Sequence, residues 1–316
     1  MDYDLIMNII FAAASSFSEQ TLTALTKLDH NIVAVLTQPD RRSGRGLQKT
    51  KNPIKSMAKK LGLLVLEYES LTNSEAYKTI KKLSPDLLLT MAYGEHIPNK
   101  ILKVIRCDSI NIHPSLLPRW RGASPIQSAI LNGDKKTGIC IARMVNELDA
   151  GPIFLSHETQ ISPHETTEAL SKRLAELSAT LIHNNLDEIL SKKIPPTEQA
   201  HKNAVYAPKI KKTDAVITWS APAIKLLRQI KAFNPWPVSY SFLKGKHFRI
   251  WDAELNNHDD LRHPPGKIVE IRDKHVLVST GKKMLALTQV QLEGRKKTTA
   301  VEFARGYDCQ GITLGC

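Results

Sequence analysis

Short runs of apolar residues alternate with longer amphipathic stretches over the first 190 residues. The apolar runs, rich in valine, isoleucine and leucine, cover residues 8–12, 32–36, 63–66, 87–91, 109–113 and 138–144. The amphipathic stretches, with apolar positions spaced as on one helical face, cover residues 18–28, 53–61, 74–82, 98–106 and 124–131. Apolar strands that alternate with helices are typical of a parallel sheet covered on both faces. The pattern predicts an α/β fold with a Rossmann-like, doubly wound parallel sheet.

A long helix is predicted to close this first region. Ser162, Pro163 and Glu165 occupy the cap, first and third positions that favour a helix start, and the helix is expected to end near Ile189. Residues 191–208 contain two adjacent prolines and few apolar residues, which is typical of a linker. We therefore expect a first domain of residues 1–190, followed by a linker of residues 191–208.

The remaining chain has the pattern of a smaller, β-rich domain of residues 209–316. Its predicted strands cover residues 216–219, 239–243, 247–253, 267–271, 275–279 and 284–291, with a helix at 221–233. Thr299 and Glu302 form a capping box that opens a final short helix. The helix and the five strands that follow it suit a small OB-like β-barrel. We expect Trp236, in a proline-rich corner, to pack between helix and barrel rather than to stack on a base.

Length and composition limit the classes of protein to which the chain can belong. Its 316 residues, 42% of them hydrophobic, suffice for two domains with real cores. No apolar run is long enough for a transmembrane helix and the N-terminus lacks the features of a secretory signal, which predicts a cytoplasmic protein. The four cysteines are scattered without metal-ligand spacing, so we expect unpaired thiols and no structural metal. Residues 13–16, after the first strand, contain no glycine, which argues against a dinucleotide cradle.

The positive charge is concentrated in two places. Residues 191–316 hold 22 Lys and Arg against 11 Asp and Glu, a net +11 of the total +13. Residues 41–60 hold eight Lys and Arg and no acidic residue. Such asymmetry indicates a polyanionic partner, nucleic acid above all. The alternatives are a basic protein without a specific partner and, for the stretch 41–60, a solvated loop.

Polar residues that can support chemistry lie at the end of one predicted strand. Asn111 and His113 are two residues apart, so they share one face of the strand while Ile110 and Ile112 share the other. Two prolines, at 114 and 118, then end the strand. An amide and an imidazole at the carboxyl end of a buried strand suit an active site in an open α/β sheet. The alternative is a polar edge strand followed by a loop.

The same stretch carries a resemblance to a known family. The run NIHPSLLPRWRGASPI at 111–126 and LDAGPI at 148–153 resemble the methionyl-tRNA formyltransferases. Further matches, TQPDRRSGRG at 37–46, AYG at 92–94, YAPKI at 206–210 and AFNPWP at 232–237, follow in the family's order. The chain departs from the family pattern at residues 13–16, at Glu147 and at Ala150.

The resemblance implies transfer of the formyl group of 10-formyltetrahydrofolate, a co-substrate, to the α-amino group of initiator methionyl-tRNA, for translation initiation. Residues 1–190 would then form the catalytic domain and residues 209–316 the tRNA-binding domain of a monomer. The resemblance places the folate at Ser115, Leu116, Leu117, Pro118, Tyr93, Gly94, Ile97 and Leu148. It implies that the basic stretch reaches the acceptor arm of the tRNA, with Arg45 as the position carried over from the family. The other tRNA contacts that we expect are Arg41, Arg42, Lys49, Lys51 and Lys209.

Three residues are the predicted catalytic set. Asn111 offers an amide N–H to an oxyanion, and His113 offers a second donor or an acid at the same place. Asp149, in the turn after the strand at 138–144, is suited to hold the imidazole in its working tautomer. Each residue alone has a structural explanation. The prediction of a catalytic role depends on the presence of all three within the family's motif.

Three other functions remain open from the sequence. A formyltransferase acting on a small amine shares the Asn-x-His motif and the distant Asp, but needs neither the basic stretch nor the basic second half. A formyltetrahydrofolate hydrolase uses the same three residues, usually with a regulatory rather than barrel-like appendage. A tRNA-binding protein with a dead enzyme fold is disfavoured by the intact set.

Overall fold

The computed structural model describes residues 6–43, 48–256 and 262–315. The chain divides into two compact units. Unit 1 comprises Met1–Pro125, Thr137–Gln160 and Ser171–Ala207, and unit 2 comprises Ile126–Lys136, Ile161–Leu170 and Pro208–Cys316. The segment predicted as a linker thus contributes all but its last residue to unit 1.

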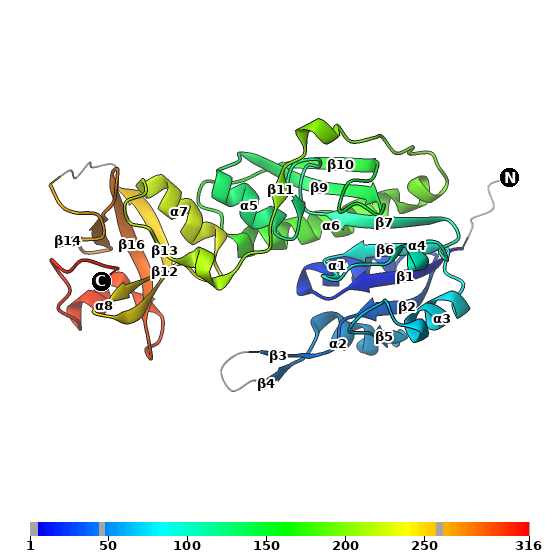
Figure 1. The fold of residues 1–316 in the computed structure, drawn as a ribbon, viewed down its shortest axis with the longest axis horizontal. Coiled ribbons are helices and arrows are strands. Elements are labelled where there is room, and N and C mark those ends of the chain that lie inside the picture. Colours follow the sequence, from blue (N-terminus) through cyan, green and yellow to red (C-terminus); the bar gives the residue numbers. More distant parts are fainter. Residues whose placement is uncertain (1–5, 44–47, 257–261, 316) are drawn as a thin grey trace. The chain divides into compact units, whose positions relative to one another are not determined.

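Unit 1 is built on a seven-stranded sheet with the order β10-β9-β7-β6-β1-β2-β5 (Figure 1). Its strands are β1 (Asn8–Ala13), β2 (Asn31–Thr37), β5 (Val65–Glu67), β6 (Leu87–Met91), β7 (Asp108–His113), β9 (Lys136–Arg143) and β10 (Ile153–Gln160). The pairs β1–β2, β1–β6, β2–β5 and β6–β7 are parallel. The chain runs from β1 outward to β5 and then restarts at β6 on the other side of β1. This reversal creates a switch point between β1 and β6, beside which ligands bind in open α/β sheets.

The predicted α/β class is confirmed, with one difference in strand direction. The strand β9 runs antiparallel to β7, so the sheet is mixed rather than wholly parallel. An apolar run shows where a buried strand lies but carries no information about its direction.

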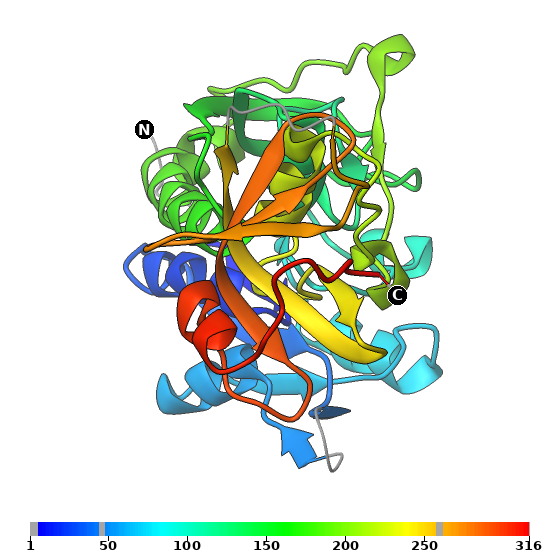
Figure 2. The same cartoon turned by 90° about the vertical axis from the view of Figure 1, so that its left-hand side faces the viewer.

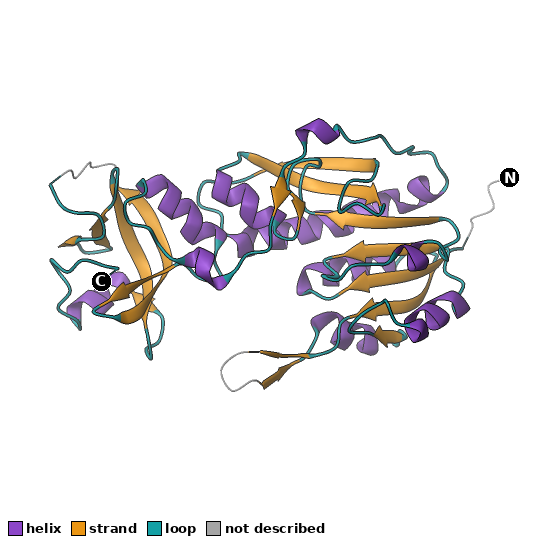
Figure 3. Ribbon diagram, in the orientation of Figure 1, coloured by secondary structure: helices purple, strands orange, loops and turns teal. Residues whose placement is uncertain are grey.

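Helices cover both faces of this sheet (Figure 3). Residues 9–12 of β1 are all fully buried, although their side chains alternate between the faces. The helical elements that begin and end between residues 16 and 190 are η1 (Ser16–Ser18), α1 (Glu19–Leu25), α2 (Pro53–Lys60), α3 (Ser74–Lys82), α4 (Asn99–Leu102), α5 (Pro125–Asn132) and α6 (Thr167–Leu190). On one face, Ile10 and Leu88 of the sheet pack with Ile80 of α3 and Ile101 of α4.

The helix α6 begins later than the sequence predicts. Ser162 and Glu165 do exchange two hydrogen bonds, from Ser162 N to Glu165 Oε2 (3.1 Å) and from Glu165 N to Ser162 O (3.0 Å). They close an isolated turn, however, and the helix starts at Thr167 with its cap at Thr166, whose Oγ1 accepts from Ala169 N (3.3 Å). The buried Thr167 hydroxyl donates to the Ala232 carbonyl (2.7 Å). This tertiary contact, which the local pattern cannot reveal, holds the first helical residue in place.

Unit 2 contains an antiparallel half-barrel with the strand order β12-β13-β16-β15-β14, and β17 pairs with β16 (Figure 2). Its elements are α7 (Ala223–Ala232), β12 (Tyr240–Leu243), β13 (Lys246–Asn256), β14 (Ile268–Ile271), β15 (Val276–Ser279), β16 (Met284–Leu292), β17 (Thr298–Thr299) and α8 (Ala300–Arg305). The predicted capping box of Thr299 and Glu302 opens α8. In place of the strand expected at 216–219, the structure has a single bridge from Val216 to Tyr240, preceded by the short helix η3 (Lys212–Ala215).

The predicted packing of Trp236 is wrong. Half of its surface is exposed, whereas the neighbouring Phe233 is buried. The corner is held by Asn234, whose Nδ2 donates to the Trp251 carbonyl (2.9 Å), and by the bond from Val238 N to Phe233 O (2.9 Å). Within the described ranges, no helix is long and apolar enough to cross a membrane.

Candidate active site

The candidate site lies at the carboxyl end of β7, two strands from β1 and next to β6. Asn111 and His113 occupy alternate positions of β7, and Ile110 and Ile112, at the other alternate positions, face the core with at most 1% of their surface exposed. The predicted sharing of faces therefore holds. Asp149 follows β9 in the turn that leads to β10.

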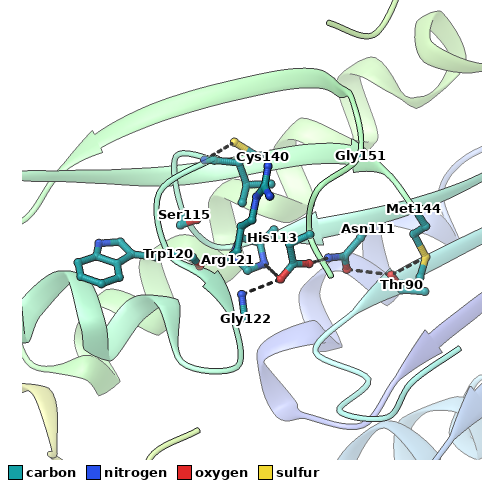
Figure 4. A network of polar contacts seen from close by, with 12 residues as sticks. Thr90, Asn111, His113, Ser115, Trp120, Arg121, Gly122, Cys140, Met144 and Gly151 are labelled. Carbon is teal, nitrogen blue, oxygen red and sulfur yellow. Dashed lines mark hydrogen bonds and ion pairs between the residues drawn. The ribbon is translucent and has the colours of Figure 1, made fainter. Parts of the chain in front are cut away.

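The carboxylate of Asp149 brings the three predicted catalytic residues together. Its Oδ1 accepts a hydrogen bond from Asn111 Nδ2 (3.0 Å), and its Oδ2 accepts one from the backbone N–H of Gly122 (2.8 Å). The same Oδ2 lies 3.5 Å from His113 Nδ1. Only 5% of the His113 side chain and 8% of the Asp149 side chain are exposed. The carboxylate is thus largely buried and has donors on both oxygens. Figure 4 shows Asn111, His113 and Gly122, the three groups that converge on it.

The surroundings of His113 fix one of its two tautomers. Its Nε2 lies 2.9 Å from the carbonyl oxygen of Trp120. Because a carbonyl only accepts, Nε2 must carry the hydrogen in this contact. In the neutral ring, Nδ1 then carries the lone pair and faces another acceptor, the Asp149 carboxylate, so Trp120, and not Asp149 as the sequence suggested, selects this tautomer. A proton taken up at Nδ1 would lie directly between imidazole and carboxylate.

The amide of Asn111 also has a fixed orientation. Because a carboxylate only accepts, the group facing Asp149 must be the NH₂. The amide oxygen accepts from Thr90 Oγ1 of β6 (2.8 Å). Asp149 takes one amide hydrogen, and the second is left to donate to a ligand.

Strained backbone conformations cluster around these side chains. Asp149 and Trp120, neither of them glycine, have φ values of +50° and +63°. Ala92, just after β6, has φ +47°. Left-handed conformations in ordinary residues cost free energy and gather at functional sites. Here they aim the Trp120 carbonyl at His113 and the Asp149 carboxylate at both partners.

A second, buried network, which the sequence did not predict, holds the backbone of the Asp149 turn. Arg121, 1% exposed, donates from Nε (3.1 Å) and Nη2 (2.8 Å) to Gln199 Oε1. Gln199, 6% exposed, donates both amide hydrogens to backbone carbonyls, those of Asp149 (2.9 Å) and Gly151 (2.7 Å). Arg121 stands inside the recognised motif, so its position was a usable signal. Gln199 lies in the segment predicted as a linker and carried no signal of its own.

Arg121 makes two further contacts at the edge of this network. Its Nη1 lies 3.6 Å from Glu147 Oε1, and its Nη2 lies 3.1 Å from His201 Nδ1. Glu147 is one of the positions where the chain departs from the family pattern, and here its carboxylate faces the buried guanidinium.

The residues predicted to bind folate surround the same edge but differ in exposure. Ser115 and Leu117 are buried, with Ser115 Oγ bonded to Arg119 O (2.6 Å) and Leu117 packed on Cys140. The other predicted positions divide into half-buried Leu116 and Pro118, buried Tyr93 and Ile97, and exposed Gly94 and Leu148. Leu148 is 64% exposed. The exposed and half-buried positions are the ones open to a ligand in this structure.

Tyr93 combines burial with an unused polar group. Only 4% of it is exposed, and its hydroxyl has no hydrogen-bond partner among the described residues. Burial, with a smaller effect of the nearby Glu95 charge, raises the pKa of Tyr93 to about 12. The hydroxyl is therefore neutral at physiological pH and can donate or accept.

The residues predicted to bind tRNA lie apart from the Asp149 network in the sequence. Arg45 falls outside the described residues. The backbone places Arg41 and Arg42 in β3 (Arg41–Ser43) and Lys49 in β4 (Gln48–Thr50), and Arg42 is the cross-strand partner of Lys49. Lys51 and Lys209 are exposed. Among the described residues, no group of three or more His, Cys, Asp or Glu is placed to hold a metal ion.

The chain matches two family models. The model of the formyl transferase family covers residues 6–186, and that of the formyl transferase C-terminal domain covers residues 209–308. Among solved structures, an N-formyltransferase from Helicobacter canadensis has a TM-score of 0.67 at 17% identity, covering 89% of this chain and 99% of that one. A methionyl-tRNA formyltransferase from Clostridium thermocellum has a TM-score of 0.58 at 17% identity, covering 91% and 99%. At this identity the likeness shows a shared fold.

Curated relatives are closer in sequence and match nearly end to end. The methionyl-tRNA formyltransferase of Hydrogenovibrio crunogenus is 38% identical over 309 residues, 98% of this chain and 99% of the relative. That of Wigglesworthia glossinidia brevipalpis is 40% identical over 299 residues, 94% and 93% of the two chains. That of Thermotoga neapolitana is 39% identical over 300 residues, 95% of each. The chain therefore belongs to the methionyl-tRNA formyltransferase family.

Proposed function

We propose that this chain transfers the formyl group of 10-formyltetrahydrofolate to the α-amino group of initiator methionyl-tRNA in the cytoplasm, with Asn111, His113 and Asp149 as catalytic residues. The observation that supports these roles best is the single carboxylate of Asp149, shared between the Asn111 amide and the His113 imidazole. A group that orients both partners at once suits acyl transfer, which needs oxyanion stabilisation and proton transfer at one place.

Asn111 stabilises the oxyanion. The methionyl nitrogen attacks the formyl carbon, the carbonyl becomes a tetrahedral oxyanion, and the bond to folate N10 then breaks. The amide hydrogen of Asn111 that Asp149 does not use donates to that oxygen. Since Thr90 and Asp149 hold the amide in advance, little reorganisation is needed as the charge develops.

His113 and Asp149 handle the proton. The attacking amine must lose a proton, and folate N10 must gain one when it leaves. Nδ1 of His113 is the basic nitrogen because Trp120 occupies Nε2, and the adjacent Asp149 carboxylate balances the charge of the protonated ring. The proton taken from the amine is then returned to N10, so the residues end in their starting state.

The folate and the tRNA are recognised in different ways. We place the pterin at the carboxyl edge of β6 and β7, beside the Tyr93–Gly94 turn, Ile97, residues 115–118 and Leu148, where apolar walls and backbone groups are available. We assign the tRNA contacts to Arg41, Arg42, Arg45, Lys49, Lys51 and Lys209. The backbone register of the β3–β4 hairpin pairs Arg42 with Lys49, and both are residue types that bind phosphate.

A transfer assay tests the proposal. The protein is incubated with folate labelled in the formyl group and, in separate reactions, with methionyl-tRNA, an amino sugar nucleotide or buffer alone. We expect the label in the tRNA fraction only. Label in the amino sugar nucleotide would point to a small-amine formyltransferase, and label released as formate without an acceptor would point to a hydrolase. Label that stays in the folate in all reactions would contradict an enzymatic role.

A further inference from the structure

The outward face of the unit 2 sheet carries an unusual set of side chains. On β12, Ser241 and Leu243 point into the core, so Tyr240 and Phe242 point outward. On β13, Phe248 and Ile250 point into the core, and His247 and Arg249 point outward. Phe242 is 37% exposed.

The rings on this face are mutually ordered. Tyr240 and His247 stack with centroids 4.0 Å apart and planes 24° apart. Phe242 meets both rings edge-on, with each centroid at 5.9 Å. Tyr240 and His247 are half-buried and Phe242 is exposed, and none of the three rings belongs to the buried core cluster of this unit.

The cluster continues across the sheet through polar groups. Arg249, the cross-strand partner of Tyr240, donates to Gln291 Oε1 of β16 (3.5 Å). Trp251 Nε1 donates to the same oxygen (3.1 Å), and Lys297 Nζ lies 5.0 Å from the centre of the Trp251 ring. We call Tyr240, Phe242, His247, Arg249 and Trp251 the aromatic face.

Charge around the aromatic face favours an anionic partner. Residues 240–256 and 284–299 hold six Lys and Arg against three Asp and Glu. Burial, and then the charge of Arg249, lower the pKa of His247, while Glu293 acts in the opposite direction. The ring is therefore neutral at pH 7 and stacks as an uncharged aromatic. Cations beside exposed rings are the combination by which proteins hold single-stranded nucleic acid.

We propose that the aromatic face stacks on unpaired bases of the tRNA substrate. This inference rests on the proposed function, because that function supplies the RNA. Rings accept the π-faces of bases, while Arg249 and the neighbouring lysines pair with phosphates. Outward strand faces of OB-type sheets are suitable surfaces for such contacts.

The test compares two exposed apolar residues of the same sheet. Phe242→Ala should weaken tRNA binding, measured by fluorescence anisotropy, about tenfold, the loss expected for one stacked base. Phe242→Tyr should restore binding because it restores a ring. The matched control is Leu255→Ala, since Leu255 is 36% exposed at the other end of β13 and should leave the affinity unchanged. Thermal unfolding checks that all three variants are folded.

Two further measurements separate stacking from other contacts. Phe242→Ala should leave the salt dependence of binding unchanged, whereas Arg249→Gln should reduce the slope of log K against log salt by about one. A single-stranded RNA should compete with tRNA better than a duplex of equal length. Equal affinity of Phe242→Ala and wild type, or equal competition by duplex and single strand, would overturn the proposal. Formyl transfer by wild type at saturating tRNA reports separately on the proposed function.

Discussion

Asp149 is the residue on which the site depends, because both of its carboxylate oxygens are fully engaged. One orients Asn111, and the other holds Gly122 and faces His113. A neutral amide in its place would present an NH₂ to at least one donor. The geometry therefore needs a group that only accepts, on both oxygens.

We expect Asn111→Ala and Asp149→Asn to slow formyl transfer by different routes. Asn111→Ala removes an oxyanion donor and should lower kcat by about two to three orders of magnitude. Asp149→Asn should lower kcat at least as much, because it disorders Asn111 and removes the charge beside His113. Single-turnover assays with saturating methionyl-tRNA measure both. Near-wild-type turnover of either variant would remove that residue from the mechanism.

Gln199 should act as a positioning residue for Asp149. Gln199→Leu removes both donors to the turn, and we expect kcat to fall about tenfold to a hundredfold while KM for tRNA stays constant, since small displacements of catalytic groups are costly. Gln199→Glu should be as damaging, because a carboxylate cannot donate to the two carbonyls.

The control for Gln199 is Gln229 in unit 2. Its Nε2 also donates to two backbone carbonyls, those of Asp214 (3.4 Å) and Val216 (3.0 Å). Gln229→Leu should change stability modestly and kcat not at all. If both glutamine variants lose stability alike and neither loses kcat, Gln199 has a purely structural role.

At the scale of elements, the site depends on the turn between β9 and β10 as much as on the strand β7. The turn approaches β9 so closely that a Cβ at Gly151 would lie 2.0 Å from the Arg143 carbonyl oxygen. Arg143 is itself held by Asp108 at the start of β7, through bonds of 3.0 Å and 2.7 Å to Asp108 Oδ2. The two strands and the turn therefore cannot move independently.

Gly151→Ala should consequently displace the Asp149 turn. We expect a fall in kcat of at least tenfold and a lower Tm, because backbone at 2.0 Å must shift. Gly306→Ala is the matched control, since its Cβ would find the nearest atom at 3.8 Å and its φ is −93°. Differential scanning fluorimetry and the transfer assay measure the two effects. Equal behaviour of both variants would show that the turn tolerates a side chain.

The sequence predicts those elements of the fold that a local pattern of apolar, polar or capping residues indicates. The apolar runs located β1, β2, β6, β7 and β9, and the capping box located α8. It missed β10, whose residues Ile153–Gln160 include only one buried position, so no apolar run marks it. Long-range contacts explain the other errors, such as Thr167 bonding to Ala232 at the start of α6.

The difference between local patterns and long-range contacts also decides which parts of the site the sequence can predict. Strand alternation was enough to pair Asn111 with His113, and the motif added Asp149. The sequence could not show that the Trp120 carbonyl selects the His113 tautomer, because that depends on a left-handed backbone conformation. It could not show Gln199 either, because that residue reaches the site from a segment about 50 positions away in the chain.

At the scale of the whole molecule, the distribution of charge implies that the two substrates are bound by different forces. Residues 191–316 carry +11 and residues 1–190 only +2, while the candidate catalytic groups form a largely buried network in unit 1. A polyanion gains binding free energy from a basic surface over its whole length. A folate gains binding free energy mainly from a shaped apolar site. Salt should therefore act on one substrate and leave the other almost unaffected.

We expect tRNA affinity to fall at least a hundredfold between about 50 and 200 mM salt, as about four phosphate contacts would require, while KM for the folate changes little.

Arg41→Gln combined with Lys49→Gln should reduce the slope of log K against log salt by about two, because each removes one phosphate contact from the β3–β4 hairpin. Lys27→Gln with Lys78→Gln removes the same charge from exposed positions outside the basic stretch and should leave the slope unchanged. Titrations of labelled tRNA at several salt concentrations measure all three proteins. A hairpin variant that keeps the wild-type slope would show that the hairpin makes no phosphate contact. Equal reductions of the slope by both double variants would show that net charge, rather than a defined hairpin contact, accounts for tRNA binding by this part of the chain.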